Sequence, residues 1–177
     1  MSALLLYISH DGQTKTIMHT IANTLQKNNI AHKICNLHEL SDINLTAYSS
    51  ILIGAPIRYG HFHHKLKKFI DAHQSYLNSI PSAFFSVTLT ARKLEKRSPQ
   101  TNLYTKKFLQ NIPWHPTLTA VFAGALRYPQ YRWYDRLMIQ FIMKKTGGET
   151  DTTKDIEYTD WQQVNQFAEH FLMLTKN

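Results

Sequence analysis

The segment that decides the fold is Ala3-Leu4-Leu5-Leu6-Tyr7-Ile8-Ser9-His10-Asp11-Gly12-Gln13-Thr14-Lys15-Thr16. The apolar run Ala3–Ile8 predicts a buried strand, and the apolar residues that follow Thr16 recur at helical spacing: Ile17, Ile21, Ala22 and Leu25. The turn between strand and helix is rich in hydroxyl groups. Because the first N–H groups of a helix lack intrahelical partners and the helix dipole adds positive charge there, this arrangement predicts an anion-binding site.

The turn suits a terminal phosphate monoester. It lacks the Gly-Lys-Ser/Thr ending of a nucleoside-triphosphate loop and the GxGxxG of a dinucleotide turn. Hydroxyl groups and backbone amides without a loop lysine favour the phosphate of FMN, and Gly12 is expected to adopt a positive φ. The expected cofactor-binding residues are Ser9, His10, Asp11, Gly12, Gln13 and Thr14. The alternative is a plain helix cap by Ser9, Asp11 or Thr14.

Two further strand ends are expected beside this turn. Ser50–Gly54 reads as a buried parallel strand and continues into Ala55-Pro56-Ile57-Arg58-Tyr59-Gly60-His61. The next strand along the chain ends in a third candidate loop, Ser86-Val87-Thr88-Leu89-Thr90. In open α/β sheets, ligands bind beyond the carboxyl ends of strands where the strand order reverses. Arg58 and Tyr59 can stack on a planar ring or simply stabilise their loop. The third segment can present its backbone to a flavin or be the plain end of a strand.

The two loops resemble those of the flavodoxin-like family, in which they hold FMN. Further blocks resemble the menaquinone-dependent protoporphyrinogen IX dehydrogenases over essentially the whole chain: Pro81–Val87, Ala91–Lys93, Glu95–Arg97, Pro99–Asn102, Ala123–Pro129, Tyr131–Arg136 and Gly147–Thr152. This resemblance implies an FMN enzyme that oxidises protoporphyrinogen IX in haem synthesis and passes electrons to menaquinone or ubiquinone. Two alternatives remain: a flavin-dependent NAD(P)H:quinone reductase and a flavodoxin-type electron carrier.

Strand and helix patterns alternate along one expected domain, residues 1–177. Strands are expected at Ala3–Ser9, His32–Leu37, Ser50–Gly54, Ser82–Leu89 and Thr119–Leu126, and helices at Thr14–Asn28, His64–Asn78, Thr101–Asn111 and Asp160–Leu174. This alternation predicts an α/β fold with right-handed crossovers. The expected architecture is a flavodoxin-like, doubly wound, five-stranded parallel sheet of order 2-1-3-4-5 with helices on both faces.

The formal net charge of +8 narrows the class of partner. A basic chain meets nucleic acid, anionic lipid or an anionic small molecule. Flavodoxin-type carriers are acidic as a family, so the charge favours a dianionic substrate or a membrane surface, and no nucleic acid is expected. The basic run Arg92, Lys93, Lys96 and Arg97 follows the fourth strand and can meet the propionates of the substrate. A solvated charge run is the alternative.

The segment Leu126–Thr153 lies between the last strand and the last helix, where a minimal fold requires only a short link, and it contains the distinctive stretch Tyr128–Lys145. A helix from about Arg132 would place Tyr134, Leu137, Met138, Phe141 and Ile142 on one apolar face, with basic residues at its margins. We expect this face to contact an anionic membrane and to help shape the substrate site, or else to dock on the sheet as a core helix. The substrate or membrane residues expected here are Arg127, Tyr131, Arg132, Trp133 and Arg136.

The cysteine content and the hydropathy of the chain bear on its location. The single cysteine, Cys35, suits a reducing compartment, and no apolar run approaches the roughly twenty residues of a membrane span. The expected location is cytoplasmic, on the inner face of the bacterial inner membrane. His61, His63 and His64 lack a nearby carboxylate or thiol to complete a metal site, so no metal is expected. No side chain is singled out as a general base.

Overall fold

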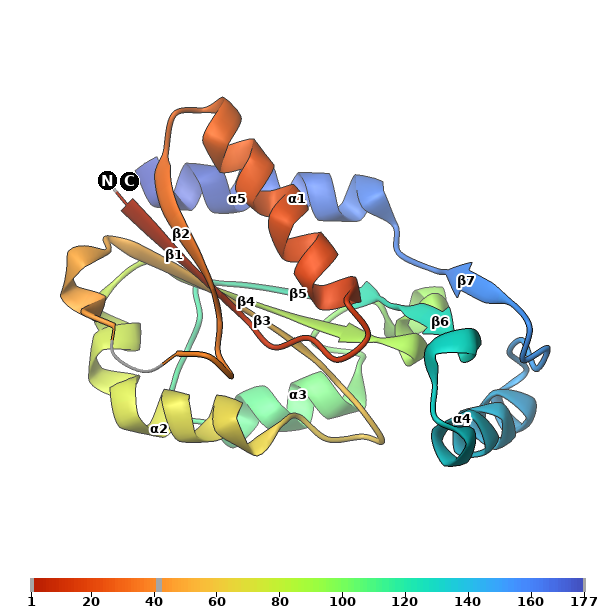
Figure 1. Ribbon diagram of the computed structural model, residues 1–177. Helices are drawn as coiled ribbons and strands as arrows, with labels where there is room; N and C mark the ends of the chain where they lie inside the picture. Colours follow the sequence, from red (N-terminus) through yellow and green to blue (C-terminus); the bar gives the residue numbers. More distant parts are fainter. Residues whose placement is uncertain (1, 41–42, 177) are drawn as a thin grey trace.

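The computed structural model describes residues 2–40 and 43–176 and has a parallel sheet at its centre (Figure 1). Its strands pair in the order β2-β1-β3-β4-β5, and every neighbouring pair is parallel. The predicted α/β architecture and its strand order are therefore confirmed. The strands are β1 (Ser2–Tyr7), β2 (Ala31–Asn36), β3 (Ser50–Pro56), β4 (Ser82–Thr88) and β5 (Leu118–Ala123).

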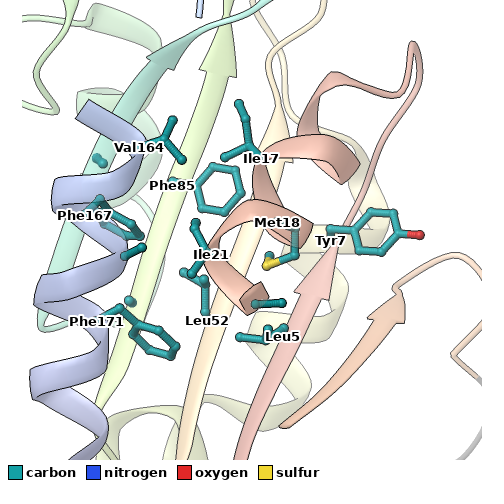
Figure 2. Close-up of a cluster of buried hydrophobic side chains, with 14 of the residues drawn as sticks. Leu5, Tyr7, Ile17, Met18, Ile21, Leu52, Phe85, Val164, Phe167 and Phe171 are labelled. Atoms are coloured by element: carbon teal, nitrogen blue, oxygen red, sulfur yellow. The ribbon is translucent and has the colours of Figure 1, made fainter. Parts of the chain in front are cut away.

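Helices cover both faces of the sheet. On one face lie α1 (Gln13–Lys27) and α5 (Trp161–Lys176), and on the other lie α2 (His64–Ser79) and α3 (Leu103–Gln110) (Figure 1). Because successive side chains of a strand point to opposite faces, Leu5 joins the cluster under α1 and α5, whereas Leu4 and Leu6 join the cluster under α2. Figure 2 shows the first cluster, in which Phe85 and Phe171 lie with Leu5.

The chain crosses to opposite faces of the sheet after β1 and β3. It leaves β1 for α1 on one face and β3 for α2 on the other (Figure 1). The carboxyl ends of these neighbouring strands therefore border the point where the strand order reverses, which is where open α/β sheets bind ligands. The amide of Ile8 donates to the carbonyl of Gly54 at 2.9 Å and holds the two ends together.

The predicted strand Thr119–Leu126 is wrong in one respect, because it is interrupted at Gly124. After β5 the chain leaves the main sheet, and β6 (Ala125–Arg127) pairs antiparallel with β7 (Asp155–Glu157), which the sequence did not reveal. The amide of Gly124 still donates to Thr88, while its carbonyl accepts from Tyr158. A Cβ at Gly124 would lie 3.2 Å from Cγ1 of Val87, so the residue passes close to β4 as the chain turns away.

The predicted helix in the long segment is α4 (Trp133–Thr146), which follows the short 3-10 helix η4 (Tyr128–Gln130). It lies beside the sheet's carboxyl edge rather than on either face (Figure 1). Its inner side packs through Met143 against Tyr128 and Tyr131, while the five residues of the predicted apolar face are 40–67% exposed. Docking of that face on the sheet is therefore wrong. In the described ranges, no helix has the length and apolar character needed to span a membrane.

We expect Gly54→Ala to destabilise the fold by roughly 1–3 kcal/mol, the usual effect of overpacking a core. A Cβ at position 54 would lie 2.2 Å from Cζ of the fully buried Phe85 on the neighbouring strand. Urea unfolding followed by circular dichroism measures this loss. Phe85→Leu removes the tip of the ring, so Gly54→Ala should have a smaller additional effect in that background. An equal effect in both backgrounds would contradict the close packing of ring on glycine.

Candidate functional site

The turn after β1 leaves the amino end of α1 open. Gly12 precedes the helix with φ at +86°, as predicted, and no side chain accepts a hydrogen bond from the first-turn amides. The first turn also contains no acidic residue. The alternative of a helix capped by Ser9, Asp11 or Thr14 is therefore wrong, and these amides are available to an anion.

Ser9 supplies a second feature of the same kind. Its Oγ is buried, and it has no hydrogen-bond partner within the described part of the chain. A buried hydroxyl group without a partner is unfavourable, so such an atom points to a missing ligand or water. The open helix end and the unpaired Ser9 hydroxyl lie on one turn and fit a phosphate group.

The side chain of Gln13 is engaged within the protein. It is buried, accepts from Nη2 of Arg127 at 2.9 Å and donates to Oγ1 of Thr159 at 2.8 Å. Oγ1 of Thr159 donates in turn to the carbonyl of Ala123. These bonds fasten the start of α1 to the end of β5 and to β6, and they hold in place the turn Ser9–Thr14, named here the phosphate turn after the ligand that the sequence predicts for it.

The loop after β3 is a tight hairpin. Arg58 and His61 exchange backbone hydrogen bonds, both 3.0 Å long, around Tyr59 and Gly60. Both central residues have positive φ, +49° and +80°, which is the conformation of a two-residue type I′ turn. A Cβ at Gly60 would lie 2.9 Å from Cε1 of Tyr104, so α3 closes one side of the turn.

Charged groups join this hairpin to the phosphate turn and to α4. Nη2 of Arg58 lies 2.9 Å from Oδ2 of Asp135, and Nη1 lies 3.6 Å from Oδ1 of Asp11. The hydroxyl of Tyr59 donates to Oδ1 of Asp135, and the Arg58 guanidinium lies 5.4 Å from the centre of the Tyr59 ring. The bond from Tyr59, followed by Arg58, lowers the pKa of Asp135 below its usual range.

Asp135 is the functional candidate that the sequence-based reasoning missed. It is the only acidic residue between Arg127 and Gly148 in a segment rich in basic and aromatic residues. That isolation was a usable signal, because a lone carboxylate in such a segment indicates a specific partner. The partner's identity, Arg58, required the tertiary structure.

The predicted segment Ser86–Thr90 consists of the end of β4 and the two residues that follow it. Ser86, Val87 and Thr88 are buried, and Oγ of Ser86 pairs with Oγ1 of Thr105 at 2.7 Å. Oγ1 of Thr88 accepts from the amide of Thr90. Asn102, which the sequence-based reasoning did not select, donates to Oγ1 of Thr90 at 3.1 Å. The hydroxyl groups of this segment are therefore engaged within the protein.

Three of the expected substrate arginines serve as internal links. Arg92 binds Oγ1 of Thr146 at 2.7 Å and the carbonyl of Leu89, so it fastens the end of α4. Arg97 pairs with Asp160 at 3.2 Å, and Arg127 pairs with Asp155 at 3.0 Å. Their positive charge is thus already directed at protein acceptors.

The other expected substrate or membrane residues are less constrained. Arg132 donates to the hydroxyl of Tyr134, and Lys93 follows the 3-10 helix η2 (Leu89–Arg92). Nε of Arg136 is buried without a partner in the part of the chain that the structure covers. Trp133 is 73% exposed, whereas Tyr131 is buried and its hydroxyl accepts from the amide of Arg127.

Three histidine rings lie close together near the hairpin, with an edge-on contact between His38 and His63. The ring centre of His63 lies 4.6 Å from that of His38 and 4.4 Å from that of His64. Across residues 2–40 and 43–176, no group of three His, Cys, Asp or Glu side chains is arranged to hold a metal ion. Nδ1 of His63 accepts from the amide of Lys65 and caps α2. Partial desolvation, with His38, His64 and Lys65 nearby, lowers the pKa of His63.

Fold and site together define a flavodoxin-like protein. A family model described as a flavodoxin domain matches residues 4–153. Solved structures with the same fold include flavodoxin 1 from Bacillus cereus, with a TM-score of 0.61 and 13% identity over 100% of this chain and 99% of that one. A flavodoxin from the domain Archaea matches with a TM-score of 0.59 and 14% identity over all of both chains. The family and fold indicate that the site binds a flavin.

The curated relatives are enzymes and are far more similar in sequence. The protoporphyrinogen IX dehydrogenase [quinone] of Escherichia coli K12 is 51% identical over 99% of this chain and 97% of its own length. The enzyme of the same name from Leishmania major is 52% identical over 97% of this chain and 74% of its own length. The chain therefore belongs to the family of quinone-dependent protoporphyrinogen IX dehydrogenases.

We expect acid to destabilise the native protein through His63. Because the pKa of His63 is lowered in the folded state, the unfolded chain takes up the proton first as the pH falls through about 6.5. Stability is then lost until the pH passes below the folded-state pKa. His63→Asn keeps a capping acceptor for α2 and cannot titrate. Urea unfolding from about pH 7.5 to pH 5 should show the variant gaining stability relative to wild type. A constant difference would contradict this assignment.

Proposed function

We propose that this chain uses bound FMN to oxidise protoporphyrinogen IX to protoporphyrin IX and passes the electrons to a quinone, menaquinone or ubiquinone. The observation that carries the proposal is 51% identity to the Escherichia coli enzyme over 97% of that enzyme's length. Similarity of this extent includes the segment from Leu126 to Thr153, which distinguishes the chain from a minimal flavodoxin fold. The enzyme's name specifies both a protoporphyrinogen substrate and a quinone acceptor.

The phosphate turn supports FMN as the cofactor. Open first-turn amides of α1 and the unpaired hydroxyl of Ser9 can donate to a terminal phosphate without any lysine. The Arg58–His61 hairpin and the backbone after β4 border the same sheet edge, where the flavin ring would lie. Bound FMN supplies an acceptor for hydride from the porphyrinogen and a donor of electrons to the quinone.

The protein's own groups orient the reactants and exclude wrong ones. The carboxylates of Asp11 and Asp135 neutralise the positive charge of Arg58. Arg58 can therefore stabilise the hairpin beside the flavin without binding other anions there. Lys93, Arg132 and Arg136 are the expected substrate cations that no carboxylate of the described residues pairs with. They are the candidates to meet the two propionates of the porphyrinogen, since charge-assisted bonds to carboxylates are the strong ones.

An anaerobic reduction experiment tests the activity directly. The FMN-loaded protein is mixed in the absence of oxygen with protoporphyrinogen IX or with NADPH, and the visible flavin absorption is followed. The proposal expects bleaching by protoporphyrinogen and recovery of the absorption on adding a quinone. Bleaching by NADPH alone would favour the NAD(P)H:quinone reductase alternative. Bleaching by neither would favour an electron carrier.

We expect Ser9→Ala to weaken FMN binding by about ten- to a hundredfold, because a hydrogen bond to a charged group contributes roughly 1.5–3 kcal/mol. Quenching of FMN fluorescence on titration with the apoprotein measures the dissociation constant. Ser50→Ala is a matched control, since Oγ of Ser50 is also buried without a described partner but lies at the start of β3, away from the ligand edge. Equal affinity in wild type and Ser9→Ala would remove Ser9 from the phosphate site.

We further propose that α4 holds the enzyme peripherally on the cytoplasmic face of the bacterial inner membrane. Its exposed apolar residues include Trp133, Leu137 and Phe141, and Lys144 and Lys145 lie at its end. Apolar side chains flanked by basic residues are typical of helices that lie in a lipid interface. The hydrophobic quinone is dissolved in the bilayer, so such contact would bring its acceptor within reach of the flavin edge.

We expect the double variant Lys144→Glu, Lys145→Glu to bind anionic liposomes at least about tenfold more weakly, because each basic residue near an anionic surface contributes roughly 1 kcal/mol. Sedimentation with vesicles containing phosphatidylglycerol measures binding. Lys106→Glu with Lys107→Glu makes the same change of charge on α3 and should have a smaller effect, with FMN content normal in both. Equal weakening by the two pairs would mean that net charge, not α4, governs binding.

A further inference from the structure

We propose that Asp135 is a positioning residue for the flavin site, acting through Arg58 and Tyr59. It accepts from the Tyr59 hydroxyl with one carboxylate oxygen and pairs with Arg58 through the other, and these two contacts are called the Asp135 clamp. The inference rests on the proposed function, which places the flavin ring beside the Arg58–His61 hairpin. It adds a residue on α4, outside the three loops that border the ligand edge.

The clamp is a specific contact rather than a loose surface pair. The side chain of Asp135 is only 15% exposed, and Nη2 of Arg58 lies 2.9 Å from Oδ2. A carboxylate that accepts from both a hydroxyl and a guanidinium fixes two side chains at once, because ionised partners form the shorter and stronger hydrogen bonds. The Arg58 guanidinium also packs on the Tyr59 ring, so each of the three side chains contacts the other two.

Arg58 and Tyr59 need such support because the two backbone bonds of their turn fix the main chain and leave these side chains unfixed. Tyr59 is 45% exposed and has a positive φ, which is uncommon for a residue other than glycine. The other carboxylate near Arg58, that of Asp11, is 3.6 Å away, beyond hydrogen-bond distance. Without Asp135 the Tyr59 ring and the Arg58 side chain would be free to change rotamers at the flavin edge.

The clamp also fastens the first turn of α4 to the hairpin after β3. At the other end of the helix, Arg92 binds the carbonyl and Oγ1 of Thr146. Between these ends the helix packs through Met143 on a small cluster that is separate from the two main cores. Asp135 therefore connects the segment that bears the exposed apolar face with the hairpin after β3, so the hairpin's geometry depends on how α4 is seated.

Two substitutions and a matched control test the proposal. Asp135→Asn removes the charge but keeps an acceptor for Tyr59, whereas Asp135→Ala removes both contacts. Asp71→Asn is the control, because it deletes the same charge from an exposed ion pair with Lys67 on α2. Amide hydrogen exchange at Arg58 and His61, whose backbone bonds close the hairpin, is measured by NMR with and without FMN. Turnover and KM are measured with protoporphyrinogen IX and a soluble quinone.

The proposal expects exchange at both amides to rise about tenfold in Asp135→Ala, which is the effect of losing roughly one charge-assisted hydrogen bond from a local structure. In the same variant we expect kcat to fall about ten- to a hundredfold and KM to change far less. The reason is that misplaced Arg58 and Tyr59 side chains disturb the geometry of the reacting groups more than they weaken substrate binding. Asp135→Asn should lie between Asp135→Ala and wild type in both readouts. Asp71→Asn should match wild type.

The clamp would be overturned if the amides of Arg58 and His61 exchange at the wild-type rate in Asp135→Ala. It would also be overturned if Asp135→Ala loses turnover without faster exchange at these amides. A fall in kcat in Asp71→Asn equal to that in Asp135→Asn would also overturn the proposal, because the effect would then follow the loss of a negative charge alone. A wild-type protein that protoporphyrinogen fails to bleach contradicts the proposed function instead. The exchange measurement in the FMN-bound protein still decides the clamp in that case.

Discussion

The amino end of α1 lacks protein partners for its first amides, and the arrangement of the ligand edge follows from this constraint. Gly12 turns the chain into the helix with φ at +86°, so no side chain reaches back to cap it. Ser9 adds a buried hydroxyl group without a partner on the same turn. Such a site is unfavourable when empty and favourable around an anion, since both the dipole and the free N–H groups point at it. The bonds of Gln13 to Arg127 and Thr159 keep the turn in place while it lacks internal partners.

The second constraint is the position of α4. A minimal flavodoxin-like fold would run from the last strand directly into α5, but this chain leaves the sheet at Gly124 and returns through β7. The small sheet β6-β7 and the ion pair of Arg127 with Asp155 form the base of this excursion. The helix at its far end keeps a broad apolar face exposed while its inner side contacts the hairpin after β3. One segment thus contacts the hairpin after β3 through Asp135 and leaves an apolar helix face exposed.

The sequence predicted the elements whose signals are local. Apolar strands, helical spacing and the positive φ of Gly12 were predicted because each depends on neighbouring residues, and the alternation of strand with helix indicated the sheet order. The break at Gly124 was missed, since an apolar run reads the same whether its strand stays in the sheet or leaves it. The roles of Arg92, Arg97 and Arg127 depend on acceptors more than 25 residues away in the chain, and spacing cannot reveal such partners. The role of Asp135 likewise depends on distant partners, Arg58 and Tyr59.

The measurement that tests the account most directly is a crystal structure of the protein with FMN bound. We expect phosphate oxygens within hydrogen-bond distance of Oγ of Ser9 and of the first-turn amides of α1, with the flavin ring beside the Arg58–His61 hairpin. A phosphate bound elsewhere, with Ser9 still unpaired and the amino end of α1 in contact with solvent alone, would contradict it.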